Sequence, residues 1–257
     1  MTGELIVTEL SEGVFTVLLN RPEKKNALNL AMYGALAGAL EEADRDDRVR
    51  AVLFTGSGGC FTSGNDIADF LQTSFLEKDG PVLRFLQALC GARKPLVAAV
   101  EGMAVGVGVT MLLHCDLAYA GEGAVFQAPF VNLGLCPEAG STLLMPRMMG
   151  HQRAAELLLL GEPFTAGRAR EVGIVNALFP DGEVTDGARA KALRLASQPP
   201  AAVRLAKELL KRDSAATLGE TVLHEAACFL ERLQSPEATE ALHAFMQRRA
   251  PDFSRFN

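Results

Sequence analysis

Two patterns of apolar residues divide most of the chain into short buried segments and longer amphipathic ones. Runs made mostly of apolar residues fall at residues 14–19, 49–54, 96–100 and 117–120, and they predict strands in the interior of a sheet. Between the first two runs, residues 29–47 carry small and apolar side chains at spacings of three and four, which predicts a helix. Short strands that alternate with helices indicate the α/β class, in which helices cover the faces of a sheet.

From about Ala188 onward, the pattern predicts helices only. The last of them carries start signals, with Ser235 as the N-cap and Pro236 at the first helical position. Each of these helices has an apolar face that needs a partner, which could be the core, another subunit, or both. The sequence therefore predicts two parts: an α/β core over residues 1–190 and a helical region over residues 191–257.

The composition excludes several classes of protein. Hydrophobic residues make up 49% and charged residues 22% of 257 positions, as in ordinary globular proteins. A net charge of −6 argues against a general affinity for nucleic acid or membrane surfaces. No apolar stretch nears the roughly 20 residues needed to span a bilayer, and we expect no signal peptide. Five scattered cysteines without a CxxC pair favour a reducing compartment and no bound metal, so we expect a cytoplasmic protein.

Two glycine-rich loops follow predicted strands and precede predicted helices. They are "FTSGNDI" at residues 61–67 and "EGMAVGVGV" at residues 101–109. Glycines at such junctions let the backbone approach a ligand closely, and two such loops could aim N–H groups at one oxygen. Tight packing of strand against helix is the alternative for either loop alone. Neither loop has the GxGxxG spacing of a dinucleotide site or the lysine of a P-loop.

The order of five motifs resembles the crotonase (enoyl-CoA hydratase/isomerase) superfamily from about Val14 to the C-terminus. The matching segments are "NRPEKKNAL", "FTSGNDI", "KPLVAAVEGMAVGVGVTMLLHCDLAYA", "FQAPFVNLGLCPEAGST" and "GEPFTAGRAREVGIVNALFP". The resemblance implies a spiral of ββα repeats with the acyl-CoA site in residues 1–190. It also implies that residues 191–257 form a helical trimerisation region. Carried over from the family, the oxyanion donors are the backbone N–H groups of Asn65 and Val107.

The chain departs from the hydratases of this family at both catalytic glutamates. Thr110 and Phe130 stand at the two positions. Glu138, in "LGLCPEAGST", instead matches the catalytic glutamate of the peroxisomal-type Δ3,Δ2-enoyl-CoA isomerases. An apolar surround would raise the pKa of such a carboxyl toward neutral pH. The spacing alone also allows a simpler role for Glu138, as an acid at the start of a helix.

Further residues are predicted to contact the substrate. Arg21, Lys24 and Lys25 could bind the phosphates of coenzyme A, although a solvated turn explains each of them equally well. The side chain of Asp66 also fits a turn or cap. The other predicted substrate contacts come from the first glycine loop and from the apolar residues around Glu138. With Asp66 they are Ser63, Asp66, Ile67, Phe130 and Leu135.

The resemblance and the surviving carboxylate together indicate a Δ3,Δ2-enoyl-CoA isomerase. We expect an acyl-CoA thioester as substrate, no separate cofactor, no nucleic-acid or membrane partner, and a homotrimer or hexamer. One alternative is an enoyl-CoA hydratase or another crotonase-type reaction in which Glu138 acts alone. The other is a non-catalytic acyl-CoA-binding protein that keeps the oxyanion loops without a working base.

Overall fold

A six-stranded sheet forms the centre of the molecule. The computed structural model describes residues 4–67 and 80–256, and within them the strand order of this sheet is β1-β2-β3-β4-β6-β9. β1 is antiparallel to β2, and the other neighbouring pairs run parallel. The strands are β1 (Ile6–Ser11), β2 (Val14–Leu19), β3 (Ala51–Gly56), β4 (Leu96–Val100), β6 (Leu117–Gly121) and β9 (Ala177–Phe179).

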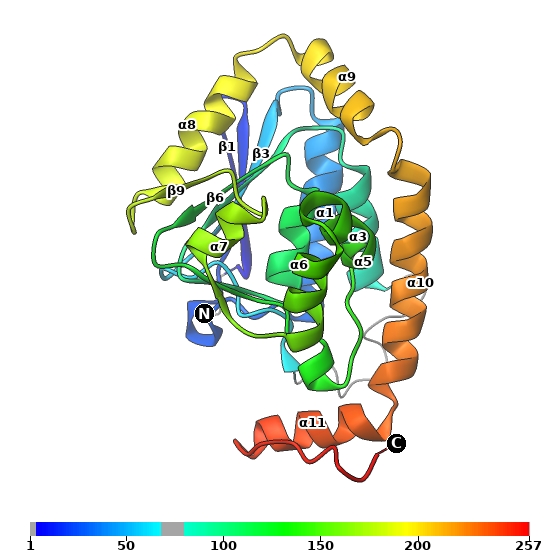
Figure 1. Cartoon of the computed structure of the whole chain (residues 1–257). Helices are drawn as coiled ribbons and strands as arrows, with labels where there is room; N and C mark the ends of the chain where they lie inside the picture. The colour runs from blue at the N-terminus through cyan, green and yellow to red at the C-terminus, as the bar shows by residue number, and fades with distance from the viewer. Residues whose placement is uncertain (1–3, 68–79, 257) are drawn as a thin grey trace.

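Helices cover both faces of this sheet, which explains why its inner strands β3 and β4 are almost wholly apolar. β3 directs Val52 and Phe54 into the main core, while Ala51 and Leu53 join a second cluster on the opposite face. The main core includes α1 (Leu30–Arg45) and α3 (Pro81–Gly91), which pack against each other. The second cluster includes α8 (Val184–Ala196), which contacts β3, β4 and β6 and lies across the sheet from α1 (Figure 1). The expected α/β class is confirmed.

A small second sheet contains part of the glycine-rich segment at residues 101–109. Its strands are β5 (Met103–Val105), β7 (Val125–Gln127) and β8 (Phe164–Thr165), with β7 in the middle. β5 leads directly into α4 (Val107–Thr110) and the 3-10 turn η2 (Met111–His114). The remaining short elements are η1 (Pro22–Lys24), η3 (Val131–Leu133), α5 (Ser141–Met149), α6 (His151–Ala155), η4 (Glu156–Leu160) and α7 (Ala166–Glu171).

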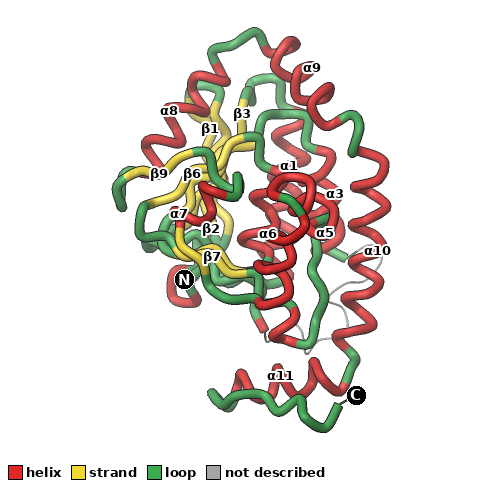
Figure 2. Tube along the Cα trace, viewed as in Figure 1, coloured by secondary structure: helices red, strands yellow, loops and turns green. Residues whose placement is uncertain are grey.

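The C-terminal part is helical, as expected, and packs on the chain's own core. It contains α9 (Pro200–Lys211), α10 (Ala215–Leu233) and α11 (Pro236–Met246). α10 runs beside α3 and α5, while α11 crosses at the end of α10 and contacts η3 (Figures 1 and 2). The hydroxyl of Ser235 accepts the N–H of Ala238, which confirms the predicted N-cap.

The expected boundary after residue 190 falls inside α8, a helix that packs on the large sheet. The helical region of the structure therefore begins with α9, and the division into two parts stays a prediction. No helix within residues 4–67 and 80–256 is long and apolar enough to cross a bilayer.

Candidate active site

Backbone hydrogen bonds join the first glycine-rich loop to β5, the strand before the second loop. The N–H of Thr62 donates to the Met103 carbonyl at 3.0 Å, and the N–H of Val105 donates to the Thr62 carbonyl at 3.1 Å. Gly64 has φ +90°, and a Cβ on it would lie 2.8 Å from the carbonyl oxygen of Val105. The missing side chain at Gly64 therefore lets the two loops come together.

In each loop, the backbone N–H that the resemblance names as an oxyanion donor has no protein acceptor in the described part of the chain. In the first loop this is Asn65, because Leu28 bonds to the backbone on either side of it, to Gly64 and to Asp66, both at 2.8 Å. In the second loop it is Val107, which begins α4 and so has no acceptor one turn earlier. Free N–H groups on two adjoining loops fit the oxyanion donors that the resemblance implied.

Tyr33 holds the side chain of Asn65. It lies on the fully buried face of α1, and its hydroxyl bonds to the side-chain oxygen of Asn65. Its ring packs against Phe85 of α3, with 5.6 Å between the centroids. The sequence analysis missed this residue, because a tyrosine on the apolar face of a helix is typical of a residue that only packs in the core.

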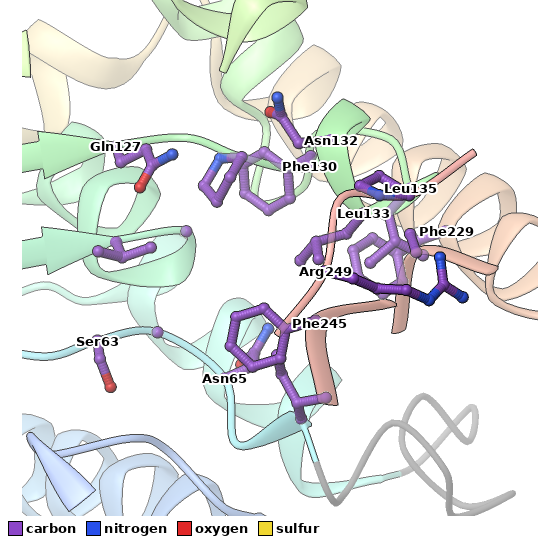
Figure 3. Close-up of a pocket in the computed structure, with 17 residues that line it drawn as sticks. Ser63, Asn65, Gln127, Phe130, Asn132, Leu133, Leu135, Phe229, Phe245 and Arg249 are labelled. Atoms are coloured by element: carbon purple, nitrogen blue, oxygen red, sulfur yellow. The ribbon is translucent and has the colours of Figure 1, made fainter. Parts of the chain in front are cut away.

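An apolar cavity of about 330 Å³ lies against the two loops. Four of the predicted substrate contacts line it, namely Ser63, Ile67, Phe130 and Leu135, and so does Asn65. Figure 3 shows that the C-terminal region also contributes to this cavity. Its contributions, which sequence reasoning missed, include Phe229 of α10, Phe245 of α11 and Arg249.

The remaining predicted substrate contacts lie outside the lining of this cavity. Arg21 and Asp66 form an ion pair with each other at 2.7 Å, which ties the 20–25 loop to the first glycine loop. Lys24 and Lys25 are exposed, and both of their carbonyls accept hydrogen bonds from Ser63. Binding of coenzyme A by Arg21, Lys24 and Lys25 and a substrate contact of Asp66 stay predictions.

Glu138 is a buried carboxyl with one weak polar contact. It is 3% exposed, and its Oε1 lies 3.5 Å from the hydroxyl of Thr110. Its pKa is raised to about 8, mainly by burial and in smaller part by the Glu225 carboxylate, while the Thr110 hydroxyl opposes the rise. The carboxyl lies in a recess beside Val222 and Phe229, outside the lining of the 330 Å³ cavity, and Phe229 lines both.

Glu225 of α10 provides the hydrogen bonds at the start of α5. Its carboxylate accepts the N–H of Gly140 at 2.5 Å, and the N–H and hydroxyl of Thr142 at 3.0 and 2.5 Å. Glu138 makes no bond to these amides within the described residues. The helix-start role that the sequence also allowed for Glu138 therefore belongs to Glu225.

His114 also holds this segment, by a hydrogen bond to the backbone of Ala139. Its Nε2 donates to the carbonyl of Ala139 at 2.7 Å, which fixes the tautomer because a carbonyl can only accept. Burial lowers the pKa of His114 to about 4, so the ring is neutral near pH 7.

The two positions at which the hydratases carry glutamates also lie at this site. Thr110 contacts Glu138, and Phe130 lines the cavity. A hydroxyl and a phenyl ring cannot take up a proton near neutral pH. Among Thr110, Phe130 and Glu138, therefore, only Glu138 can act as a base.

The fold and the site together define a crotonase-type α/β protein, in which two glycine loops present N–H groups beside an apolar cavity. Residues 9–255 match the family model described as enoyl-CoA hydratase/isomerase, and the chain belongs to this family.

Similarity to individual proteins extends over nearly the whole chain. It is 37% identical over 253 residues to enoyl-CoA delta isomerase 2 of Rattus norvegicus, covering 96% of this chain but only 64% of the rat protein. It is 31% identical over 255 residues to the probable enoyl-CoA hydratase echA8 of Mycobacterium bovis, covering 99% of each. The solved structure of OdaA from Pseudomonas aeruginosa matches with a TM-score of 0.93 at 49% identity, covering 96% of this chain and 100% of that one. These similarities support a crotonase-type acyl-CoA reaction and leave isomerase and hydratase undecided.

Proposed function

We propose that the protein is a Δ3,Δ2-enoyl-CoA isomerase that shifts the double bond of a 3-enoyl-CoA to the 2-position. The observation that carries this proposal is the buried carboxyl of Glu138, with a pKa raised to about 8, while Thr110 and Phe130 occupy the hydratase positions. Similarity to the rat enoyl-CoA delta isomerase 2 supports the same reaction.

The first step is removal of a proton from C2 of the substrate. The ionised Glu138 takes this proton, and the C2–H electron pair moves toward the thioester carbonyl. The product is a dienolate with its negative charge on the carbonyl oxygen. The N–H groups of Asn65 and Val107 stabilise that charge without having to reorganise, because they are fixed in the backbone.

The second step returns the same proton at C4. The enolate electrons re-form the carbonyl, the double bond settles between C2 and C3, and Glu138 becomes ionised again. C2 and C4 are both next to C3, so one carboxyl can serve the two carbons. Only a proton moves and no redox change occurs, so the reaction requires no cofactor beyond the coenzyme A of the substrate.

The acyl chain has to reach the recess that holds Glu138. Phe229 lines both this recess and the cavity beside Asn65. We therefore infer that the reacting carbons pass beside Phe229, with the thioester carbonyl at the two loops. The apolar side chains Phe130 and Leu135 suit an acyl chain in the cavity.

A homotrimer or hexamer remains part of the proposal. On the inner side of α9, the ammonium of Lys207 bonds to the carboxylate of Asp116, with 2.7 Å from Nζ to Oδ2. On the same helix Leu205, Leu209 and Leu210 are exposed. Leucines exposed together on one helix offer a surface that another copy could cover.

The deciding experiment supplies trans-3-hexenoyl-CoA and follows the absorbance of the conjugated enoyl thioester. An isomerase accumulates this product, whereas a hydratase consumes it when trans-2-hexenoyl-CoA is supplied directly. A flat trace with the 3-enoyl substrate and rapid loss of the 2-enoyl compound would favour the hydratase. Binding of the CoA ester without either reaction would favour a non-catalytic binder.

The pH dependence of kcat/KM is expected to follow ionisation of Glu138. The base must lose its proton before it can accept one from C2, so activity rises with pH through the pKa of Glu138. With that pKa at about 8, kcat/KM should fall roughly tenfold per unit below about pH 7 and level off above about pH 9. Initial rates across this range test the assignment. A midpoint at the ordinary carboxylate value would contradict it.

A further inference from the structure

Two left-handed residues connect Glu138 to α5. Ala139 has φ +59° and Gly140 has φ +73°. The first is a costly conformation for a residue with a Cβ, so surrounding contacts must hold it. The carbonyl of Ala139 is held by His114 and the N–H of Gly140 by Glu225. The turn that presents Glu138 is therefore fixed from both sides.

The α10 helix supplies more than the Glu225 carboxylate. Val222, Ala226 and Phe229 lie within one turn of Glu225 on α10 and line the recess of Glu138. Leu218 of the same helix packs so closely on Gly140 that a Cβ there would lie 2.3 Å from its side chain. One face of α10 thus covers the base while Glu225 anchors the backbone beside it.

The two buried carboxyls are unequal in hydrogen bonding. Glu225 receives two N–H bonds and a hydroxyl bond, whereas Glu138 has one contact at 3.5 Å. Burial raises the pKa of both carboxyls, but the donors of Thr142 and Gly140 oppose that rise at Glu225, so Glu225 carries its negative charge more readily than Glu138 does. The titratable groups that surround the pair are Cys90 of α3, His114 of η2, Cys136 of the Glu138 segment, Lys211 of α9, and His224 and Cys228 of α10.

We propose that Glu225 is a positioning residue for the isomerisation: its bonds to Gly140 and Thr142 hold the segment that carries Glu138, and its charge acts on the neighbouring carboxyl. This inference rests on the proposed function. It gives the C-terminal helical region a part in the chemistry of its own subunit, in addition to any part in assembly.

The test replaces Glu225 with glutamine, which keeps the shape and removes the charge. A glutamine has one acceptor oxygen, so it cannot replace both carboxylate oxygens in the bonds to Gly140 and Thr142. We expect kcat to fall by about 10²-fold, because small displacements of a base are costly, with KM within about twofold since Glu225 does not line the cavity. The rising limb of the kcat/KM profile should move to lower pH, because the loss of a neighbouring negative charge lowers the pKa of Glu138.

Three further variants complete the test, and the first of them separates the charge of Glu225 from its geometry. Glu225→Asp keeps the charge with a shorter reach, so the limb should return toward the wild-type pH while kcat stays low. Glu220→Gln changes an exposed acid on the same helix and should alter neither quantity. If Glu225→Gln does not fold, Thr142→Val removes one donor and should give a smaller shift of the limb in the same direction. A limb that stays at the wild-type pH, whatever happens to kcat, would overturn the proposal.

A measurement without substrate distinguishes failure of this inference from failure of the proposed function. Titration of protein labelled with ¹³C at the glutamate carboxyls, with Glu138→Gln to assign the signal, reports the pKa of Glu138 directly. A lower midpoint in Glu225→Gln supports the coupling even if 3-enoyl-CoA is not a substrate. An unchanged midpoint in an active enzyme overturns the role of Glu225 and leaves the isomerase assignment intact.

Discussion

Replacing Glu138 with glutamine is expected to lower kcat for isomerisation by about 10³- to 10⁴-fold. The amide cannot accept the C2 proton or return it at C4, and Thr110 and Phe130 cannot substitute for it at neutral pH. The change is nearly isosteric, and Glu138 lies outside the lining of the main cavity, so KM should change little. Steady-state assays with trans-3-hexenoyl-CoA measure both constants. Retention of more than about a tenth of the wild-type kcat would eliminate Glu138 as the base.

The stability of the Glu138→Gln variant is a control for its folding. In the folded protein the pKa of Glu138 is about 8, well above the ordinary value of 4.5. Wild-type stability therefore falls as pH rises between these two values, because only the folded state keeps the proton. Glutamine does not titrate, so Glu138→Gln should match the wild type near pH 4 and exceed it near pH 8, by a few kcal/mol at most. Urea unfolding at both pH values measures the difference. A variant less stable than the wild type at pH 8 would mean that the activity loss has another cause.

The elements that the sequence predicted best are those whose side chains face one uniform environment. β2 and β4 have the predicted bounds, because strands buried on both faces read as continuous apolar runs. The small sheet was not predicted, since strands of two or three residues are too short to establish a period of two. β3 begins two residues later than expected, an ordinary error for the end of an element.

The residues of the candidate site also fall into those that the sequence predicted and those that it missed. Asn65, Val107 and Glu138 were predicted because each lies within a contiguous motif of the family. Glu225 was missed because it meets Gly140 only through packing of α10 on α5, far away in the sequence. A signal was nevertheless present: an acid at position 225 interrupts the apolar stripe of its helix. A charge in a stripe that faces the core has to find a partner there.

Arg21 shows what a motif leaves open. Its place in a family motif suggested a contact with coenzyme A, yet its guanidinium bonds to Asp66, another predicted substrate contact. A sequence gives the type of a charged side chain and its approximate neighbourhood. It does not give the direction of the side chain, which depends on which opposite charge the fold brings closest.

Replacing Gly64 with alanine is expected to lower kcat by about 10²- to 10³-fold, the usual cost of losing one oxyanion donor. A Cβ at this position would lie 2.8 Å from the Val105 carbonyl oxygen; the oxygen is a backbone atom, and the backbone of residue 64 fixes the Cβ, so neither can rotate away. The first loop must therefore move from β5, which separates the N–H of Asn65 from that of Val107. Loss of dienolate stabilisation affects the transition state more than substrate binding, so the change should appear in kcat.

Gly59→Ala is the matched control, because it separates backbone strain from the clash. Gly59 has φ +68°, similarly unfavourable for alanine, but its Cβ would meet nothing within 4 Å. This variant should lose about 1 kcal/mol of stability and keep its kcat within about twofold. Assays of both variants at a temperature where circular dichroism shows each one folded decide between the two effects. Equal losses of kcat in Gly64→Ala and Gly59→Ala would attribute the defect to strain in the loop, and the contact between Gly64 and Val105 would then have no special part in setting the oxyanion donors.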